Sequence, residues 1–188
     1  MDSGKIRKEA RFLTDKMAHE LNLSMPQYND VYEINYDFIF AVNHLMNDVT
    51  KGNSRALDKY FYNLDTRNDD LRWVLSERQY RQFLGIEYFY RPIYASGNKW
   101  HFKVYITYTN HSLFYFGKPQ CYHTYHSGHY RTDHNHTSYY KDKYNHVHYH
   151  GSYSVKSENV YHNNRHSDFG TNDRKNNKEN SSRRNKHN

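Results

Sequence analysis

The chain has 188 residues, a hydrophobic fraction of 36% and a formal net charge of +7. This amount of apolar side chain is sufficient for one domain of ordinary size and insufficient for two well-packed ones. The one cysteine, Cys121, excludes an intramolecular disulfide and a four-thiolate zinc site within the chain.

The N-terminal sequence carries charges where a signal peptide needs an apolar run. No segment approaches the roughly 20 apolar residues of a membrane span. We therefore expect a cytoplasmic or nuclear protein that is not secreted and has no membrane partner.

Composition divides the chain near residue 116. After Leu113 there is no further Leu, Ile, Met or Trp, so the core is expected to end near Phe116. Residues 1–116 contain 15 Lys/Arg and 14 Asp/Glu, whereas residues 117–188 contain 12 and 6. The sequence therefore predicts a neutral folded domain over residues 1–116 and a basic tail over residues 117–188.

Two amphipathic helices are predicted at the start of the chain. Apolar side chains recur at spacings of three and four over residues 4–23, where Asp2 or Ser3 can cap the helix. The same pattern recurs over residues 29–51, with Gly52 as a stop.

Two shorter helices are expected to follow. The first would bury apolar side chains of residues 57–64, and the second would run from a cap at Asn68 or Asp69 to Gly85. About four helices thus precede the first predicted strand.

From Ile86 the hydrophobic period becomes that of strands. Residues 86–94 and 99–108 are rich in aromatic and β-branched side chains, and the Ser-Gly-Asn sequence at 96–98 favours a hairpin turn between them. A third strand is predicted over residues 112–116. The expected fold class is α+β, with about four N-terminal helices, a three-stranded antiparallel meander and a disordered tail.

Beyond Gly117 the hydrophobic periodicity is lost, and Tyr, His, Asn, Asp, Ser and Lys predominate. Such a segment cannot bury enough apolar surface to offset its chain entropy, which predicts disorder. The tyrosines between residues 122 and 161 leave one alternative open, an irregular strand such as 147–155.

Eleven of the fifteen histidines lie in the tail, some at alternating positions such as His146, His148 and His150. Alternate residues of an extended strand share a face and could chelate a divalent metal ion. Compositional drift is the simpler interpretation, because codons for Tyr, His, Asn and Asp differ by single bases. We therefore assign no metal site and no cofactor.

The tail also interleaves cationic and aromatic side chains. Cations bind phosphates and rings stack on unpaired bases, so this pattern is typical of binding to single-stranded nucleic acid. The candidate nucleic-acid-binding residues are Tyr139, Tyr140, Lys141, Lys143, Tyr144, Arg174, Lys175, Arg183, Arg184 and Lys186.

The sequence contains no nucleophile motif, phosphate-binding loop, paired-cysteine motif or His-Glu-x-x-His helix, so we expect no enzyme. The leading hypothesis is a non-enzymatic, nucleic-acid-associated accessory protein. Its tail would contact RNA or single-stranded DNA, and its helical domain would bind a protein partner or self-associate. The alternative is a protein–protein interaction module with an inert, solubilising tail.

The richness in Asn, Lys, Tyr and Phe indicates an AT-rich genome, and a small domain with a biased tail is typical of viral accessory proteins.

Overall fold

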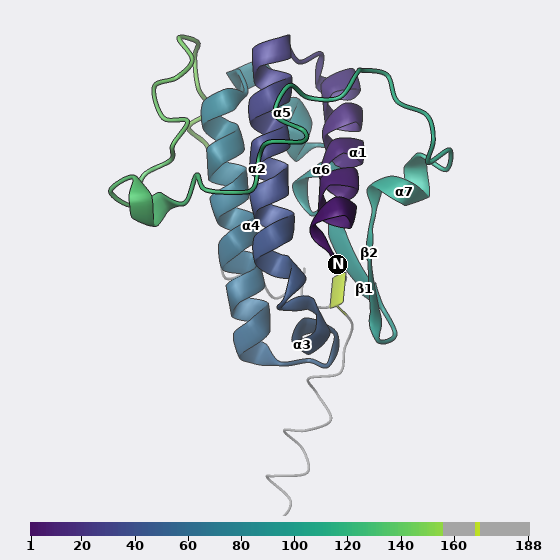
Figure 1. Cartoon of the computed structure of the whole chain (residues 1–188). Coiled ribbons are helices and arrows are strands. Elements are labelled where there is room, and N and C mark those ends of the chain that lie inside the picture. The colour runs from purple at the N-terminus through teal and green to yellow at the C-terminus, as the bar shows by residue number, and fades with distance from the viewer. Residues whose placement is uncertain (156–167, 170–188) are drawn as a thin grey trace, which may run out of the picture.

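A computed structural model describes residues 1–155 and 168–169 of the chain. Within them the protein is mostly helical, with seven α-helices and one two-stranded antiparallel sheet. Figure 1 shows α1, α2 and α4 side by side as the body of the fold, with the hairpin of β1 and β2 near the N-terminal end of α1. The elements are α1 (Ser3–Leu21), α2 (Met25–Asn43), α3 (Met46–Thr50), α4 (Ser54–Val74), α5 (Glu77–Leu84), α6 (Glu87–Tyr90), β1 (Ile93–Ser96), β2 (Lys99–Phe102), α7 (Val104–Thr107) and the 3-10 helix η1 (Arg131–Asp133).

The first predicted helix is confirmed as α1. The Asp2 carboxylate accepts a hydrogen bond from the Lys5 N–H and caps the helix, and Asn22 ends it in a left-handed conformation at φ 52°. The predicted apolar face is buried against α2 and includes Ile6, Ala10, Leu13, Met17 and Leu21.

The second predicted helix, over residues 29–51, is in fact two helices, α2 and α3. The helix α2 starts earlier than predicted because the Ser24 hydroxyl caps it in a reciprocal capping box. It ends at Asn43, whose side chain accepts a hydrogen bond from the Met1 ammonium at 2.7 Å and donates one to the Met1 carbonyl. The break between α2 and α3 therefore lies beside a contact between Asn43 and Met1, which a local sequence pattern cannot reveal.

The predicted helix boundary at Asn68 or Asp69 is wrong, because α4 runs continuously through both residues. Neither side chain caps a helix: Asn68 donates to the Tyr90 carbonyl of α6, and Asp69 binds Arg72 of the same helix and Arg131 of η1. The next helix, α5, is capped by Ser76.

The predicted hairpin is confirmed over a shorter span. The strands β1 and β2 pair antiparallel with Ile93 opposite Phe102, and Gly97 provides the left-handed turn residue at φ 59°. The flanking predicted strand residues form the one-turn helices α6 and α7.

The predicted third strand over residues 112–116 is absent, so the sheet has two strands and not three. The backbone N–H groups of Tyr115 and Phe116 donate to the buried carboxylate of Asp15, at 2.9–3.1 Å. The Lys16 ammonium, which pairs with Asp15, donates to the Leu113 carbonyl at 2.6 Å. A buried ion pair on α1 thus satisfies the backbone groups that a neighbouring strand would otherwise bind.

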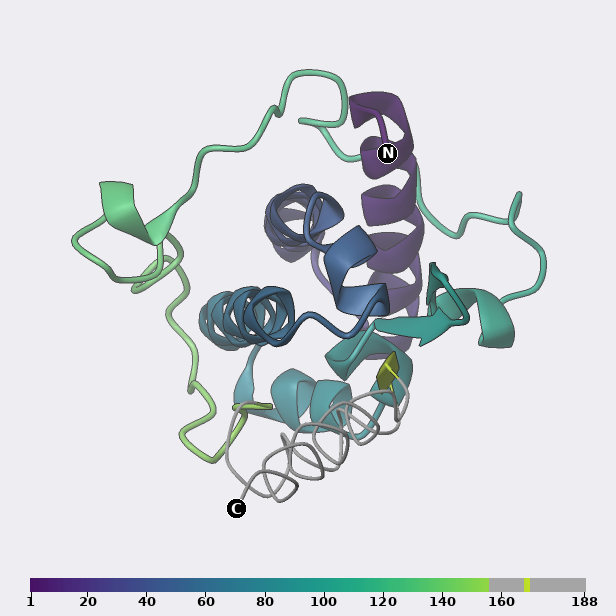
Figure 2. The same cartoon turned by 90° about the horizontal axis from the view of Figure 1, so that it is seen from below.

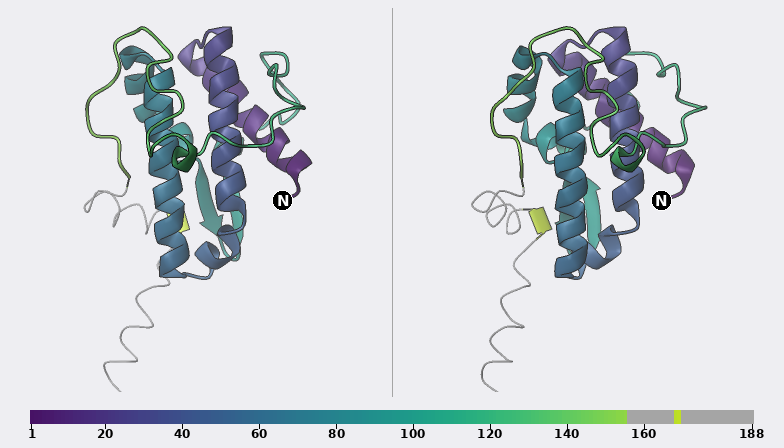
Figure 3. Two further views of the ribbon diagram at one scale, coloured as in Figure 1. Left: turned by 60° about the vertical axis from the view of Figure 1, so that its left-hand side comes forward. Right: turned by 90° about the vertical axis from the view of Figure 1, so that its left-hand side faces the viewer.

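Residues 117–155, which we call the C-terminal wrap, pass around the outside of the helices with little regular structure (Figures 2 and 3). Side chains of the wrap bind carboxylates on α2 and α4: Tyr125 binds Asp37, Lys143 binds Asp30, and Ser154 binds Asp65. Near α5, the Tyr149 ring stacks on Tyr80 at a centroid distance of 5.0 Å.

The wrap differs from the expected tail, because Tyr140 and Val155 are buried in the core with exposed fractions of 1% and 0%. In the wrap, hydroxyl–carboxylate hydrogen bonds and ring stacking take the place of the aliphatic contacts whose absence led to the prediction of disorder.

That residues 1–116 fold alone stays a prediction, which circular dichroism of a chain ending near Lys118 would test.

Two core substitutions test the helical packing. Leu45 and Val104 are both buried, so alanine at either position is expected to lower the free energy of unfolding by about 1–4 kcal/mol through loss of apolar contact and cavity formation. The control Lys141→Ala removes an exposed side chain and is expected to change it by less than about 0.5 kcal/mol. Chemical denaturation measures all three, and unchanged stability of Leu45→Ala would contradict the burial of Leu45 between α2 and α3.

Candidate functional site

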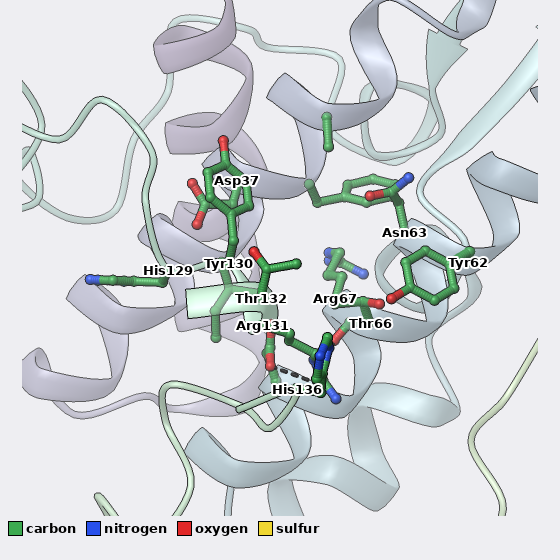
Figure 4. A pocket seen from close by; sticks show the side chains of 14 residues that line it. Asp37, Tyr62, Asn63, Thr66, Arg67, His129, Tyr130, Arg131, Thr132 and His136 are labelled. Atoms are coloured by element: carbon green, nitrogen blue, oxygen red, sulfur yellow. Dashed lines mark hydrogen bonds and ion pairs between the residues drawn. The ribbon is translucent and has the colours of Figure 1, made fainter. Parts of the chain in front are cut away.

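A pocket of about 200 Å³ lies between α2, α4 and the part of the wrap around η1 (Figure 4). Aromatic and apolar side chains form much of its wall, and four charged side chains reach it. The apolar and aromatic lining residues include Phe38, Ala41, Tyr62 and Tyr130, and the charged ones are Asp37, Arg67, Asp70 and Arg131.

Asp37 is held in the pocket by the wrap. Its Oδ2 accepts a hydrogen bond from the Tyr125 hydroxyl at 2.7 Å. Its Oδ1 is buried and accepts no hydrogen bond of normal geometry from the described residues. Burial raises the pKa of the Asp37 carboxyl, and the nearby Ser127 and Tyr125 hydroxyls oppose this shift in part. Asp37 therefore attaches the wrap to α2.

Arg131 attaches η1 to α4. One guanidinium nitrogen, Nη2, lies 2.6 Å from Asp69 Oδ2 and 2.8 Å from Asp70 Oδ1. Burial acts to raise the pKa of the Asp69 carboxyl, but hydrogen bonds from Arg131 and Arg72 lower it below its usual value. The Arg131 Nε is buried and donates no hydrogen bond to any described residue.

Arg67 also lines the pocket and is buried, without a carboxylate partner in the part of the chain that the structure describes. Its guanidinium donates to the Asn35 side chain at 2.9 Å and to the Phe89 carbonyl at 2.9 Å. Burial lowers the pKa of Arg67 to about 9, so the side chain is protonated at neutral pH.

Asp70 makes stability depend on pH. Burial raises the pKa of its carboxyl from 3.8 to about 6, so between these values the folded state binds more protons than the unfolded chain. The contribution of Asp70 to stability is therefore present below about pH 4 and lost as the pH rises through about 6. We expect the unfolding free energy of the wild type, relative to that of Asp70→Asn, to fall by about 1–3 kcal/mol from pH 4 to pH 7.

Denaturant unfolding of both proteins at the two pH values measures this difference. A wild-type advantage that grows with pH would contradict the raised pKa of Asp70.

A second feature, which we call the α1 cation cluster, consists of Arg7 and Arg11 on α1 with Lys118, His123 and His126 of the wrap. Arg7 Nη2 donates to His126 Nδ1 at 2.9 Å, and Lys118 Nζ lies 3.4 Å from His123 Nε2. None of the three Lys and Arg residues forms an ion pair with a carboxylate among the described residues.

Arg11 and Lys118 of the α1 cation cluster lie near aromatic rings. The guanidinium carbon of Arg11 is 3.9 Å from the ring centroid of Phe114 and 5.9 Å from that of Tyr122, and Lys118 Nζ is 5.0 Å from the Tyr122 ring. In both Arg7 and Arg11 the Nε is buried without a hydrogen-bond acceptor in the described residues. The cluster therefore presents cationic donors that lack an anionic partner.

Several of the sequence-predicted binding residues are engaged inside the protein. Tyr140 is buried, and its hydroxyl lies 3.0 Å from His129 Nδ1. Lys143 Nζ and the Tyr144 hydroxyl both bind the Asp30 carboxylate at 2.7 Å. These side chains therefore hold the wrap in place in the structure.

The other predicted binding residues are exposed or lie outside the described residues. Tyr139 is 40% exposed and stacks one face on His129, at a centroid distance of 3.6 Å. Lys141 is exposed, with its Nζ 6.0 Å from the Trp73 ring. The predicted residues outside the described ranges are Arg174, Lys175, Arg183, Arg184 and Lys186.

The described residues contain no group of three or more His, Cys, Asp or Glu side chains arranged to hold a metal ion. Of the alternating histidines, His146 and His148 contact each other at a ring centroid distance of 4.8 Å. Burial lowers the pKa of His146, and the charge of His148 adds to this effect. In the same ranges of the chain, the helices are all too short or too polar to cross a membrane.

Sequence reasoning missed the pocket and the α1 cation cluster. Arg7 and Arg11 are one helical turn apart, a spacing that places two cations on one face of a predicted helix and is a visible signal. The pocket residues come from α2, α4 and η1, and no local pattern connects them.

We compared the chain with protein-family models, with curated proteins and with solved structures, and none of the three comparisons gives a match.

Proposed function

We propose that the protein is a non-enzymatic binder of single-stranded nucleic acid, and that the phosphate backbone binds along the α1 cation cluster. The observation that carries this proposal is the pair of arginines, Arg7 and Arg11, neither of which forms an ion pair with a carboxylate among the described residues. Arginine binds phosphate oxygens with several donors at once, and a bound phosphate would supply an anionic partner for the two guanidinium groups.

Aromatic side chains beside the cluster support an unpaired strand over a duplex. The Tyr115 ring is 41% exposed and stacks on His19 of α1, at a centroid distance of 3.8 Å. Tyr115 follows Phe114 in the chain, and the Phe114 ring packs on the Arg11 guanidinium of the cluster. Bases of a single strand can stack on such rings while their phosphates contact the cations.

The basic C-terminal sequence would extend this surface. Residues 117–188 carry a net charge of +6 with histidine neutral, which attracts polyanions and increases the rate of encounter. In this proposal Arg174, Lys175, Arg183, Arg184 and Lys186 add sequence-independent phosphate contacts, whereas the α1 cation cluster positions the strand.

The test is fluorescence anisotropy of a labelled single-stranded RNA oligonucleotide titrated with the full chain. Replacing Arg7 and Arg11 together with glutamine is expected to weaken binding by about tenfold or more, since each charge-assisted hydrogen bond contributes on the order of 1.5–3 kcal/mol. The matched control Arg55→Gln removes an exposed arginine from α4 and is expected to leave the affinity nearly unchanged.

If the double variant and the control bound the RNA with equal affinity, the α1 cation cluster would not be part of the binding site. Absence of RNA binding by the wild type, together with capture of a protein that survives removal of residues 170–188, would support the protein-interaction module instead.

A further inference from the structure

Two described residues beyond the wrap, Asp168 and Phe169, are attached to the helical body (Figures 1 and 2, yellow). Asp168 is buried, with 2% of its surface exposed, and Phe169 is partly buried against the core. In the sequence from 156 to 188 the larger apolar side chains are Val160, Tyr161 and Phe169. The last aromatic residue of the chain, preceded by a carboxylate, is therefore the one that contacts the core.

The Asp168 carboxylate lies between two cations. Its Oδ1 accepts a hydrogen bond from Lys103 Nζ at 2.5 Å, and its Oδ2 lies 3.7 Å from Arg91 Nε. Glu87, whose side chain is exposed, pairs with the same two cations at 2.7 and 2.8 Å. Without Asp168, these three side chains would carry one net positive charge. The position of Asp168 therefore favours a second carboxylate.

Two aromatic side chains of α4 receive the Phe169 ring. The centroid of this ring lies 4.9 Å from that of Tyr60 and 6.1 Å from that of Phe61, and both contacts are edge-to-face. Edge-to-face geometry is favourable for aromatic pairs. A carboxylate and a ring on adjacent residues are thus bound by separate groups, which we call the latch site and which consists of Tyr60, Phe61, Arg91 and Lys103.

The latch site adjoins a pocket that is open to solvent. Asp168 and Lys103 form part of the wall of this pocket, which has a volume of about 340 Å³. Ile106, with 64% of its surface exposed, and the rings of Tyr88 and Tyr94 form much of the rest. Departure of Asp168 would therefore leave the Lys103 ammonium facing a pocket that ligands in solution can enter.

We propose that the latch site binds an acidic residue followed by an aromatic one, and that Asp168 and Phe169 fill it as an intramolecular latch. The latch attaches the start of the basic sequence 170–188, which contains six Lys/Arg and two Asp/Glu, to the helical body. The latch site shares no residue with the α1 cation cluster, so the latch does not require nucleic-acid binding.

The short connection to the wrap favours this occupant over a second copy of the chain. Twelve residues, 156–167, separate Asp168 from Val155. Val155 is itself anchored, because it is buried and its backbone N–H donates to the Asp65 carboxylate at 2.7 Å. A ligand on a short tether has an effective concentration on the order of a millimolar, against which a second copy at roughly micromolar concentration competes poorly.

The experiment uses the full chain and a fluorescent peptide with the sequence of residues 163–174. The latch variant combines Asp168→Asn with Phe169→Ala and so removes the chain's own ligand from the latch site. Control peptides carry each of these substitutions singly. Lys103→Met, added to the latch variant, removes the cation that binds Asp168, and Lys99→Met, which replaces an exposed lysine of β2, is the matched control.

Fluorescence anisotropy is expected to show that the peptide binds the latch variant. The wild type is expected to bind it about tenfold or more weakly, because its latch site is occupied. Each control peptide, and the added Lys103→Met, is expected to weaken binding by about tenfold or more, since a charge-assisted hydrogen bond or a buried ring is lost. Lys99→Met is expected to leave the affinity unchanged.

Acetylation of lysines in the native protein, read by mass spectrometry, provides a measurement without a peptide. Lys103 is held between Glu87 and Asp168, with 12% of its side chain exposed, so in the wild type it is expected to react more slowly than Lys99. In the latch variant it is expected to react several-fold faster. Circular dichroism verifies each fold, and Phe169→Ala alone provides the same comparison if the double substitution unfolds the protein.

Three results would overturn the latch. Absence of peptide binding by the folded latch variant, or binding equal to that of the wild type, would show that the latch site does not recognise the peptide. Unchanged acetylation of Lys103 on removal of the latch would show that Asp168 does not cover it. A wild-type dimer that becomes monomeric in the latch variant, measured by light scattering, would show that the segment binds between two copies of the chain.

Discussion

Arg67→Ala is expected to lower the free energy of unfolding by about 3–5 kcal/mol, because the substitution removes a buried side chain that joins four helices. The Arg67 guanidinium donates to Asn35 on α2 and to the carbonyl of Phe89 on α6, and its Nη2 lies 3.7 Å from the sulfur of Met17 on α1. Alanine leaves these acceptors buried without a donor, beside a cavity as large as the lost side chain.

Urea denaturation of Arg67→Ala and of the control Arg55→Ala measures the effect. Arg55 is exposed, so Arg55→Ala is expected to lower the free energy of unfolding by less than about 0.5 kcal/mol. Arg67→Met retains much of the volume and avoids burying a charge, so we expect it to be more stable than Arg67→Ala but less stable than the wild type. If Arg67→Ala unfolded at the urea concentration of the wild type, Arg67 would not be a core residue.

Tyr140→Ala is expected to destabilise the protein by about 3–5 kcal/mol, whereas Tyr139→Ala next to it should cost less than about 1 kcal/mol. Tyr140 belongs to the wrap and is buried, and its hydroxyl lies within hydrogen-bond distance of His129 and of Glu33 on α2. Burial raises the pKa of Tyr140, so its hydroxyl stays protonated and can donate. Tyr139 is partly exposed and loses mainly its stacking on His129.

Thermal unfolding of the two alanine variants decides whether the wrap is part of the core. Equal melting temperatures of the two variants would place residues 117–155 outside the folded unit, in agreement with the boundary at residue 116 that composition favours.

The sequence predicted best those elements whose determinants are local. The helix α1 combines a cap at Asp2 with an apolar face of period 3.6, and the hairpin turn combines Gly97 with flanking aromatic residues. By contrast, the N–H groups of Tyr115 and Phe116 bind Asp15, about a hundred positions earlier, and no strand forms there. Propensity cannot reveal a partner at that separation.

Contacts between residues far apart in the chain also explain why the sequence did not predict the wrap or the candidate sites. Acidic side chains on helices, such as Asp30, Asp37 and Asp69, match the solvated face of an amphipathic pattern, yet in the structure they bind tyrosines and cations of the wrap. A tract rich in Tyr and His has no aliphatic residues from which to predict burial. Of the site residues, the helical spacing of Arg7 and Arg11 was visible in sequence, and their lack of acidic partners was not.

The central claim, that a cationic surface binds the phosphates of a single strand, is tested most directly by the salt dependence of the affinity. The measurement is the dissociation constant of a labelled single-stranded RNA for the full chain between about 50 and 200 mM salt. If roughly six phosphates are engaged, counterion release predicts that the affinity falls about a thousandfold over this range, with little dependence on RNA sequence. An affinity that does not change with salt would contradict the claim.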